Sequence, residues 1–501
     1  MVSGRSRLFL VSALIAMGLV ILLPLPGLSQ AGTFALATMV FAAVLWVTEG
    51  LPLPATALCV PILLTLFGVF PTMAGALQAF ADPIIFLLLA GFVLAEALKK
   101  HGIDRRIAYY LIGGLGTSAR GIVFAVMAAT ALLSMIVSNS ATTAMMVPIA
   151  LGIARELTET QAESPASTSN IEIALLLGTA YAASIGGVGT LIGTPANAIV
   201  VAQLQTQLDH HISFLDWLAI GLPLVAVGLP VAWYLLVYRL FPPATVDVEQ
   251  AQSHAAGALD ELGSLNSAGR RTVGITSATA GLWVLGGLDF LFEDILPPAW
   301  YSTIFGGAGS IIGATHQGVL YYVLVGLAAV PMLLAADALE WDDVLRIDWG
   351  TLVLLGGGLA LADGLAATDA TQWLAELTFG GLTGVSVLVL ILVVISVTVF
   401  LSELASNTAV VAIFAPILIT IGPRYATVLN TTDEGAAVFL AVAGAVAASF
   451  GFALPVATPP NAIAFGTGTI HREHMLHAGV RLDILMILLS AVVLLGGFVL
   501  L

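Results

Sequence analysis

Two short polar motifs occur twice each in this apolar sequence, and they contain the residues best suited to binding chemistry. Ser-Asn-Ser at 138–140 returns as Ser-Asn-Thr at 406–408, and Gly-Thr-Pro-Ala-Asn at 193–197 returns as Ala-Thr-Pro-Pro-Asn at 457–461. Backbone N–H groups freed at a helix N-terminus favour an anion. Unwound carbonyls and hydroxyl oxygens suit a small hard cation such as Na⁺. The motifs therefore indicate a site for ions.

The copies keep nearly one spacing over a long stretch of chain. Ser138 and Ser406 lie 268 residues apart, Thr194 and Thr458 lie 264 apart, and Glu96 and Asp363, which stand in similar apolar contexts, lie 267 apart. Three landmarks at almost the same offset favour a duplicated unit. In a membrane protein, interrupted apolar segments at corresponding positions of two halves point to a transport site.

The composition requires a membrane protein. Of 501 residues, 59% are hydrophobic and 9% are charged, whereas soluble domains carry roughly a quarter charged residues. The net charge is −15, with acids crowded into loops and no basic patch that would favour nucleic acid. Acidic loops also suit a salt-rich environment, where screening is strong, and so favour a halophilic source. The lone Cys59 cannot form a disulfide within the chain.

Each Ser-Asn motif interrupts an apolar run, at 121–149 and 385–421, that is too long for one tidy span. We expect each run to form a re-entrant helical hairpin with the motif at its tip. Such irregular backbone survives at membrane depth only where it is buried in protein or lines a cavity. The runs 171–201 and 436–468, which hold the other motif pair, predict helices unwound at their centres.

These elements predict an all-α polytopic protein with about eleven transmembrane helices and two re-entrant hairpins. The first apolar run, 8–25, could be a signal peptide, but as a first helix it lets the later spans alternate correctly. We expect four regions: an N-terminal helix at 1–30, a first repeat at 31–240, a polar connection at 241–271 and a second repeat at 272–501.

The distribution of Lys and Arg predicts the orientation. With a cytoplasmic N-terminus and an extracellular C-terminus in the plasma membrane, only Arg424 of the loop cations falls outside, as the positive-inside rule requires. The two repeats then enter the membrane from opposite faces, which makes them inverted repeats.

Neither motif pair contains Lys or Arg. A buried carboxylate without a counter-charge is very costly, and bound sodium ions would remove that penalty. We therefore hypothesise that this deficit of positive charge couples anion binding to cation binding.

Several other residues are weaker candidates. Glu403 adjoins a tip and could orient the hairpin, since intramembrane acids are candidates for function. Glu96 and Asp363 lie near helix ends, where an interfacial position explains them equally well. The histidines lie in loops without a metal-ligand framework. No His-Glu-x-x-His or Gly-x-Ser-x-Gly motif supports an intramembrane enzyme, and we expect no organic cofactor.

At the paired tips and breaks, the chain resembles the divalent anion–sodium symporter family. The resemblance covers nearly the whole chain and includes Trp-Val-Thr-Glu-Gly-Leu-Pro at 46–52 and Ile-Asp-Trp-Gly-Thr at 347–351. It implies a homodimeric elevator-type transporter with Na⁺ as the co-transported ion. C4 dicarboxylates such as succinate, malate or fumarate are the typical substrates, and citrate or sulfate are others. An exchanger and a proton-coupled carrier remain alternatives to the symporter.

The resemblance also implies roles for individual residues. Two sodium sites would use Ser134, Ser138, Asn139 and Gly193, and Ser402, Ala405, Asn407 and Ala457. The anion would meet Asn139, Ser140, Thr194, Asn407, Thr408, Thr458 and Pro459. Two departures from the family pattern bear on substrate choice: Ser140 stands where Thr is usual, and Ala196 stands where a second proline is usual.

Overall fold

The computed structural model describes residues 4–159, 170–243, 249–311, 317–379, 381 and 385–500, and every regular element in these ranges is helical. Six of the helices are long and apolar enough to cross a membrane, or seven if a pair bent by 43° (Met73–Ala81 and Pro83–Lys100) forms one span. The six are Gln30–Thr48, Phe214–Leu240, Trp349–Ala367, Val387–Leu404, Asn407–Leu429 and Arg472–Gly497. The chain is thus an all-α polytopic membrane protein, and the count of eleven spans stays a prediction.

Both Ser-Asn motifs lie where one helix ends and the next begins. In the first half, α7 (Ala119–Ser134) is followed by α8 (Asn139–Glu159). In the second half, α19 (Val387–Leu404) is followed by α20 (Asn407–Ile421). Asn139 and Asn407 are each the first helical residue after the tip, so their amides lie beside N–H groups that the helix leaves unpaired.

Both predicted unwound helices are present. The first consists of α9 (Asn170–Gly187) and α10 (Pro195–Leu208), and the second of α22 (Asp433–Ala448) and α23 (Pro459–Phe465). Pro195 and Pro459 occupy the first helical position, where a missing N–H costs nothing. The extended backbone of Thr194 and Thr458 immediately precedes them.

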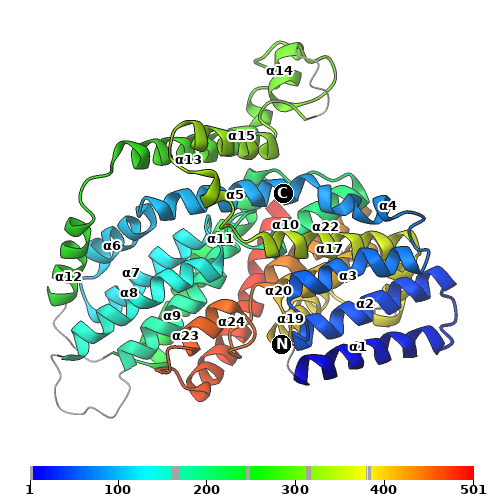
Figure 1. Ribbon diagram of the computed structural model, residues 1–501, viewed down its shortest axis with the longest axis horizontal. Helices are drawn as coiled ribbons and strands as arrows, with labels where there is room; N and C mark the ends of the chain where they lie inside the picture. Colours follow the sequence, from blue (N-terminus) through cyan, green and yellow to red (C-terminus); the bar gives the residue numbers. More distant parts are fainter. Residues whose placement is uncertain are drawn as a thin grey trace.

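The two halves interlock through these broken helices. The short helix α10 packs against α20 and α22 of the second half, while α23 packs against α8 and α9 of the first. Figure 1 shows α23 beside α8 and α9 although they are far apart in sequence. The helix that follows each break therefore packs against the other half of the chain.

Two helices cross close to the unwound segments. In α11 (Phe214–Tyr234), a Cβ on Gly221 would lie 2.5 Å from the carbonyl oxygen of Val188. In α24 (Arg472–Leu500), a Cβ on Gly479 would lie 2.2 Å from the carbonyl oxygen of Phe452. Real Cβ contacts do not come this close, so glycine is needed at both crossings.

The remaining helices pack around this centre. Figure 1 shows α1, α2, α3 and α17 side by side on one side of the molecule, and α6 to α9 on the other. Their bounds, with those of the helices that complete the fold, are α1 Gly4–Leu22, α2 Gln30–Thr48, α3 Leu53–Leu66, α4 Met73–Leu77, α5 Pro83–Lys100, α6 Ile103–Leu115, α12 Glu249–Glu261, α13 Ser267–Gly286, α14 Pro298–Phe305, α15 Tyr322–Ala335, α16 Trp341–Val344, α17 Trp349–Ala367, α18 Ala370–Phe379 and α21 Ala426–Leu429.

Two elements differ from the prediction. The polar connection at 241–271 contains α12, because its run of Ala, Gln and Glu has high helix propensity. The final helix begins at Arg472, whereas hydropathy alone predicts a final span only over the apolar run 482–501. Its first turns are polar and escape a hydropathy criterion, yet Met475 and Ala478 are fully buried.

Candidate functional site

The first tip is tied to the break of α9 by two side chains. The Ser134 hydroxyl lies 2.6 Å from the Asn139 side-chain amide and donates to the carbonyl oxygen of Ala183 at 2.8 Å. With its nitrogen turned toward the neighbouring carbonyls, Asn139 donates to Ala183 at 3.1 Å and to Gly193 at 3.3 Å. Ser134, Asn139 and Gly193, three of the four residues predicted for the first sodium site, therefore meet.

The second tip repeats this arrangement. The Ser402 hydroxyl is within hydrogen-bonding distance of Asn407 Oδ1 at 2.7 Å and of the carbonyl oxygen of Ala448 at 2.5 Å. Gly451 lies beside this pair, since a Cβ on it would be 3.2 Å from Ala457 Cβ and 3.4 Å from the Ser402 carbonyl oxygen. Ser402, Asn407 and Ala457, three of the four residues predicted for the second sodium site, thus lie close together.

Close backbone packing brings the oxygens of the first break together. A Cβ on Gly187 would lie 2.4 Å from the side-chain amide of Asn139, and one on Gly193 would lie 2.5 Å from the Gly187 carbonyl oxygen. Only glycine fits at these contacts. Carbonyl, hydroxyl and amide groups therefore lie close together at the first break, and oxygens of these kinds are the ligand chemistry of Na⁺.

Asn197 and Asn461, at corresponding positions of the two halves, each hold the unwound backbone of one break by hydrogen bonds. Asn197 Nδ2 donates to the carbonyl oxygens of Gly187 at 3.1 Å and Thr190 at 2.8 Å. Asn461 Nδ2 donates to those of Gly451 at 2.9 Å and Leu454 at 3.0 Å. Both side chains are fully buried. Sequence reasoning placed them in the repeated motif without giving them a role; their recurrence at one spacing was the available signal.

Four predicted residues at the tips take no part in the contacts between tip and break: two sodium candidates and two anion candidates. Ser138 accepts a hydrogen bond from Ala141 N at 3.4 Å, and Ala405 ends α19 in an extended conformation. Ser140 and Thr408, each the second residue of its helix, have no side-chain hydrogen-bond partner in the described part of the chain. They are hydroxyls beside open helix N-termini, and an anion there would meet both the hydroxyl and the N–H groups.

The other anion candidates lie at the starts of the short helices. Thr194 is buried and precedes α10 without a side-chain cap. Thr458 is buried, and its hydroxyl accepts from Asn461 N at 3.3 Å. Pro459 is exposed.

The second break contains carboxyl groups that the first lacks. Glu403 accepts from Ala453 N at 2.8 Å and from Leu454 N at 2.9 Å, and Asp483 of α24 accepts from Phe452 N at 3.2 Å. The two carboxyl groups together accept from three successive backbone N–H groups, those of Phe452, Ala453 and Leu454. Glu403 thus positions the unwound backbone, as its place next to the tip suggested. Asp483 was missed, although an acid at the start of an apolar final run was a usable signal.

The first break is held by neutral groups at the corresponding positions. The Thr190 hydroxyl donates to the carbonyl oxygen of Met135, the residue that corresponds to Glu403. The buried indole of Trp217 donates to the Val188 carbonyl oxygen at 3.0 Å. Within the described residues, no group of three or more His, Cys, Asp and Glu side chains could hold a metal ion.

Comparison with known proteins identifies the relatives of this arrangement. The family described as "Sodium:sulfate symporter transmembrane region" matches residues 5–500. The sodium-dependent dicarboxylate transporter SdcS of Staphylococcus saprophyticus is 35% identical over 468 residues, covering 93% of this chain and 86% of the relative. SdcS of a bovine Staphylococcus aureus strain is 33% identical over 450 residues, covering 89% and 82%.

A solved structure resembles the fold. It is the YdaH transporter of Alcanivorax borkumensis, with a TM-score of 0.53, 16% sequence identity and coverage of 91% of this chain and 97% of that one. At this identity the likeness concerns the fold alone.

Proposed function

Since the chain belongs to the sodium:sulfate symporter family, whose members are membrane transporters rather than enzymes, we propose that it carries dicarboxylates across the plasma membrane together with sodium ions. The relatives named as sodium-dependent dicarboxylate transporters favour a dicarboxylate over sulfate. C4 dianions such as succinate, malate and fumarate are the substrates to test first.

One observation supports this proposal above the others: the same Ser–Asn contact occurs at both tips, each joined to the break of the following helix. Each half of the chain then provides one sodium site, from Ser134, Asn139 and Gly193, and from Ser402, Asn407 and Ala457. The carbonyl, hydroxyl and amide oxygens at each tip are suitable Na⁺ ligands. Neutral helix termini complete the site for the anion.

The absence of Lys and Arg from the four motifs gives the coupling a physical cause. Helix N-termini contribute only partial positive charge, which does not balance two carboxylates taken out of water. Sodium ions bound at both tips supply that charge. The empty protein and the protein with all its ligands then carry a similar local charge, while the protein with the anion alone does not.

The interlocked halves support alternating access with the paired sites as one unit. Because α10 packs on α20 and α22 while α23 packs on α8 and α9, the two tips and two breaks form a single packed body. In the elevator mechanism that we propose, this body moves across the membrane as a whole within a homodimer. The N-terminus is then cytoplasmic and the C-terminus extracellular.

The deciding experiment is uptake of radiolabelled succinate by proteoliposomes with sodium and proton gradients imposed separately. Symport predicts accumulation under an inward sodium gradient and none under a proton gradient alone. Sodium-independent counterflow against internal succinate would instead show an exchanger, and uptake driven by protons alone would show a proton-coupled carrier.

A further inference from the structure

The turn between α5 and α6 gathers positive charge in an otherwise acidic chain. Four of the 15 Lys and Arg residues, Lys99, Lys100, Arg105 and Arg106, line a cavity of about 360 Å³ together with residues 262–266 before α13. No acidic side chain lines this cavity. We call it the basic cavity.

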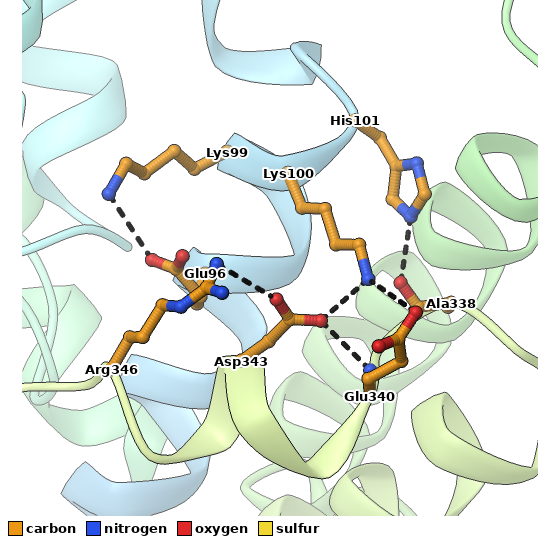
Figure 2. A network of polar contacts seen from close by, with 8 residues as sticks. All are labelled: Glu96, Lys99, Lys100, His101, Ala338, Glu340, Asp343 and Arg346. Carbon is orange, nitrogen blue, oxygen red and sulfur yellow. Dashed lines mark hydrogen bonds and ion pairs between the residues drawn. The ribbon is translucent and has the colours of Figure 1, made fainter.

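Two of the four cations are paired with acids outside the cavity. Lys99 Nζ lies 3.4 Å from Glu96 Oε2, and Lys100 Nζ lies 2.6 Å from Asp343 Oδ2. Figure 2 shows this network, in which Arg346 also contacts Asp343. Lys99 and Lys100 therefore contribute less net charge to the basic cavity than their number suggests.

The other two cations have no carboxylate partner among the described residues. Arg106 donates to the carbonyl oxygens of Leu262 and Gly263, both at 2.7 Å, and so satisfies the carbonyl end of α12. Its Nε is buried without a partner. Arg105 is exposed. Asp104 lies beside them; its carboxyl accepts a hydrogen bond from its neighbour's backbone, Arg105 N, and forms no ion pair with either guanidinium among the described residues, and burial raises the pKa of Asp104.

An apolar groove of about 380 Å³ begins where the basic cavity ends. It is lined by Ile107, Tyr110 and Leu111 of α6, with Leu132 of α7 and Leu259 of α12, and Arg106 lines both the groove and the cavity. The Tyr110 side chain is 74% exposed, so the groove opens outward. Positive charge and an apolar channel thus meet at one arginine.

We propose that the basic cavity and this groove together bind one anionic phospholipid, with its phosphate at Arg105 and Arg106 and an acyl chain along α6. Basic pockets at the cytoplasmic ends of membrane helices suit lipid head groups, and arginine is well matched to phosphate. A free phosphate would use the cavity but leave the groove unfilled. The site shares no lining residue with the proposed sodium and anion sites.

The position of this lipid gives it a structural consequence. Helix α6 joins α5 to the hairpin helix α7 along the chain, and α12 belongs to the segment that connects the two halves. A lipid held between α6, α7 and α12 joins these three elements at the cytoplasmic side predicted from the charges.

Native mass spectrometry of the purified full-length chain tests the proposal by counting retained lipid. Dioleoyl phosphatidylglycerol should stay bound at one molecule per chain, while dioleoyl phosphatidylcholine should not. Removing both charges in Arg105→Gln/Arg106→Gln should weaken phosphatidylglycerol binding about 30-fold, from the effect of one basic residue near an anionic lipid taken twice. Arg424→Gln, which removes one exposed charge far along the chain, is the matched control and should bind as wild type.

Two further measurements keep the result interpretable. Lys99→Gln/Arg105→Gln removes two charges but keeps the Arg106 contacts to α12, and its affinity for phosphatidylglycerol should be severalfold lower than that of wild type. Tyr110→Ser, which alters the groove and leaves all four cations in place, should also lower the affinity severalfold. Equal retention of phosphatidylglycerol by the Arg105/Arg106 double variant would overturn the proposal. Displacement of the lipid by millimolar inorganic phosphate, or no effect of Tyr110→Ser, would show a site for a small anion instead.

Discussion

The two broken helices are alike in their ion-binding groups and different in what holds their backbone. At both, the serine of a Ser–Asn pair contacts a carbonyl oxygen of the helix that leads into the break, and a buried asparagine donates to two carbonyls of the unwound segment. In the second break, backbone N–H groups donate to the carboxyl groups of Glu403 and Asp483. In the first break, a hydroxyl and an indole donate to backbone carbonyl oxygens. The conserved part of the duplication is the chemistry of ion binding, and the divergent part is the support.

This difference shows how two copies of one unit can serve a single anion. The oxygens that would face sodium must be matched, since both sites need the same ligands. The supporting groups only have to satisfy buried polar atoms, and either carboxylates or neutral donors can do so. The second break accordingly has carboxyl groups beside its tip, whereas a hydroxyl and an indole support the first.

The largest expected effect comes from removing the Ser–Asn contact that the two halves share. Asn139→Ala and Asn407→Ala should each abolish sodium-driven succinate uptake in proteoliposomes, because each deletes a ligand and the partner of a buried serine. Size-exclusion profiles and melting temperatures would verify that both variants remain folded. Full uptake by either folded variant would show that the two tips are not equivalent.

Glu403→Ala should have the next largest effect, because it removes hydrogen bonds to unwound backbone that only the second half has. It leaves the N–H groups of Ala453 and Leu454 unpaired, at about 1–3 kcal/mol each, so the melting temperature and uptake should both fall. Met135→Leu, the conservative change at the corresponding position of the first half, should cost below about 1.5 kcal/mol. Equal loss in the two variants would contradict the asymmetry.

A matched pair of glycine substitutions sharpens the comparison. A Cβ at Gly187 would lie 2.4 Å from the side-chain amide of Asn139, whereas one at Gly451 would lie 3.2 Å from Ala457 Cβ. Overpacking costs typically about 1–3 kcal/mol, and the first clash is both closer and directed at a polar side chain, whereas the second meets only the methyl group of Ala457. Gly187→Ala should therefore raise the sodium concentration needed for half-maximal uptake more than Gly451→Ala does. The reverse order would mean that the second break is the tighter one.

The smallest effect lies outside both breaks, at Asp343. Burial opposes ionisation there, but the hydrogen bonds from Lys100 and from the Glu340 backbone hold the pKa of Asp343 below its usual value. Because the pKa of Asp343 is lower in the folded protein than in the unfolded chain, its ionised form stabilises the folded protein at pH values above the unfolded pKa. This stabilisation is lost as the pH falls through the folded pKa. Asp343→Asn should cost about 1–2 kcal/mol at pH 7, and thermal melts should show the gap to wild type closing below about pH 4.

Much of the centre of the molecule follows from the sequence. Ser-Asn motifs inside long apolar runs predicted helix interruptions, and α8 and α20 begin at Asn139 and Asn407. The partners of these residues could not be predicted, because they are carbonyls exposed only when a distant helix unwinds, as at Ala183 and Ala448. Helix α12 and the polar start of α24 escaped because hydropathy detects apolar spans, not helices that are only partly apolar.

The central claim is that the anion crosses only with sodium bound at both tips. Simultaneous counting of ²²Na⁺ and ¹⁴C-succinate entering the same proteoliposomes tests it most directly. The account predicts that at least two sodium ions enter with each succinate, and that succinate entry stops when choline replaces sodium. Succinate accumulation without any sodium entry would contradict it.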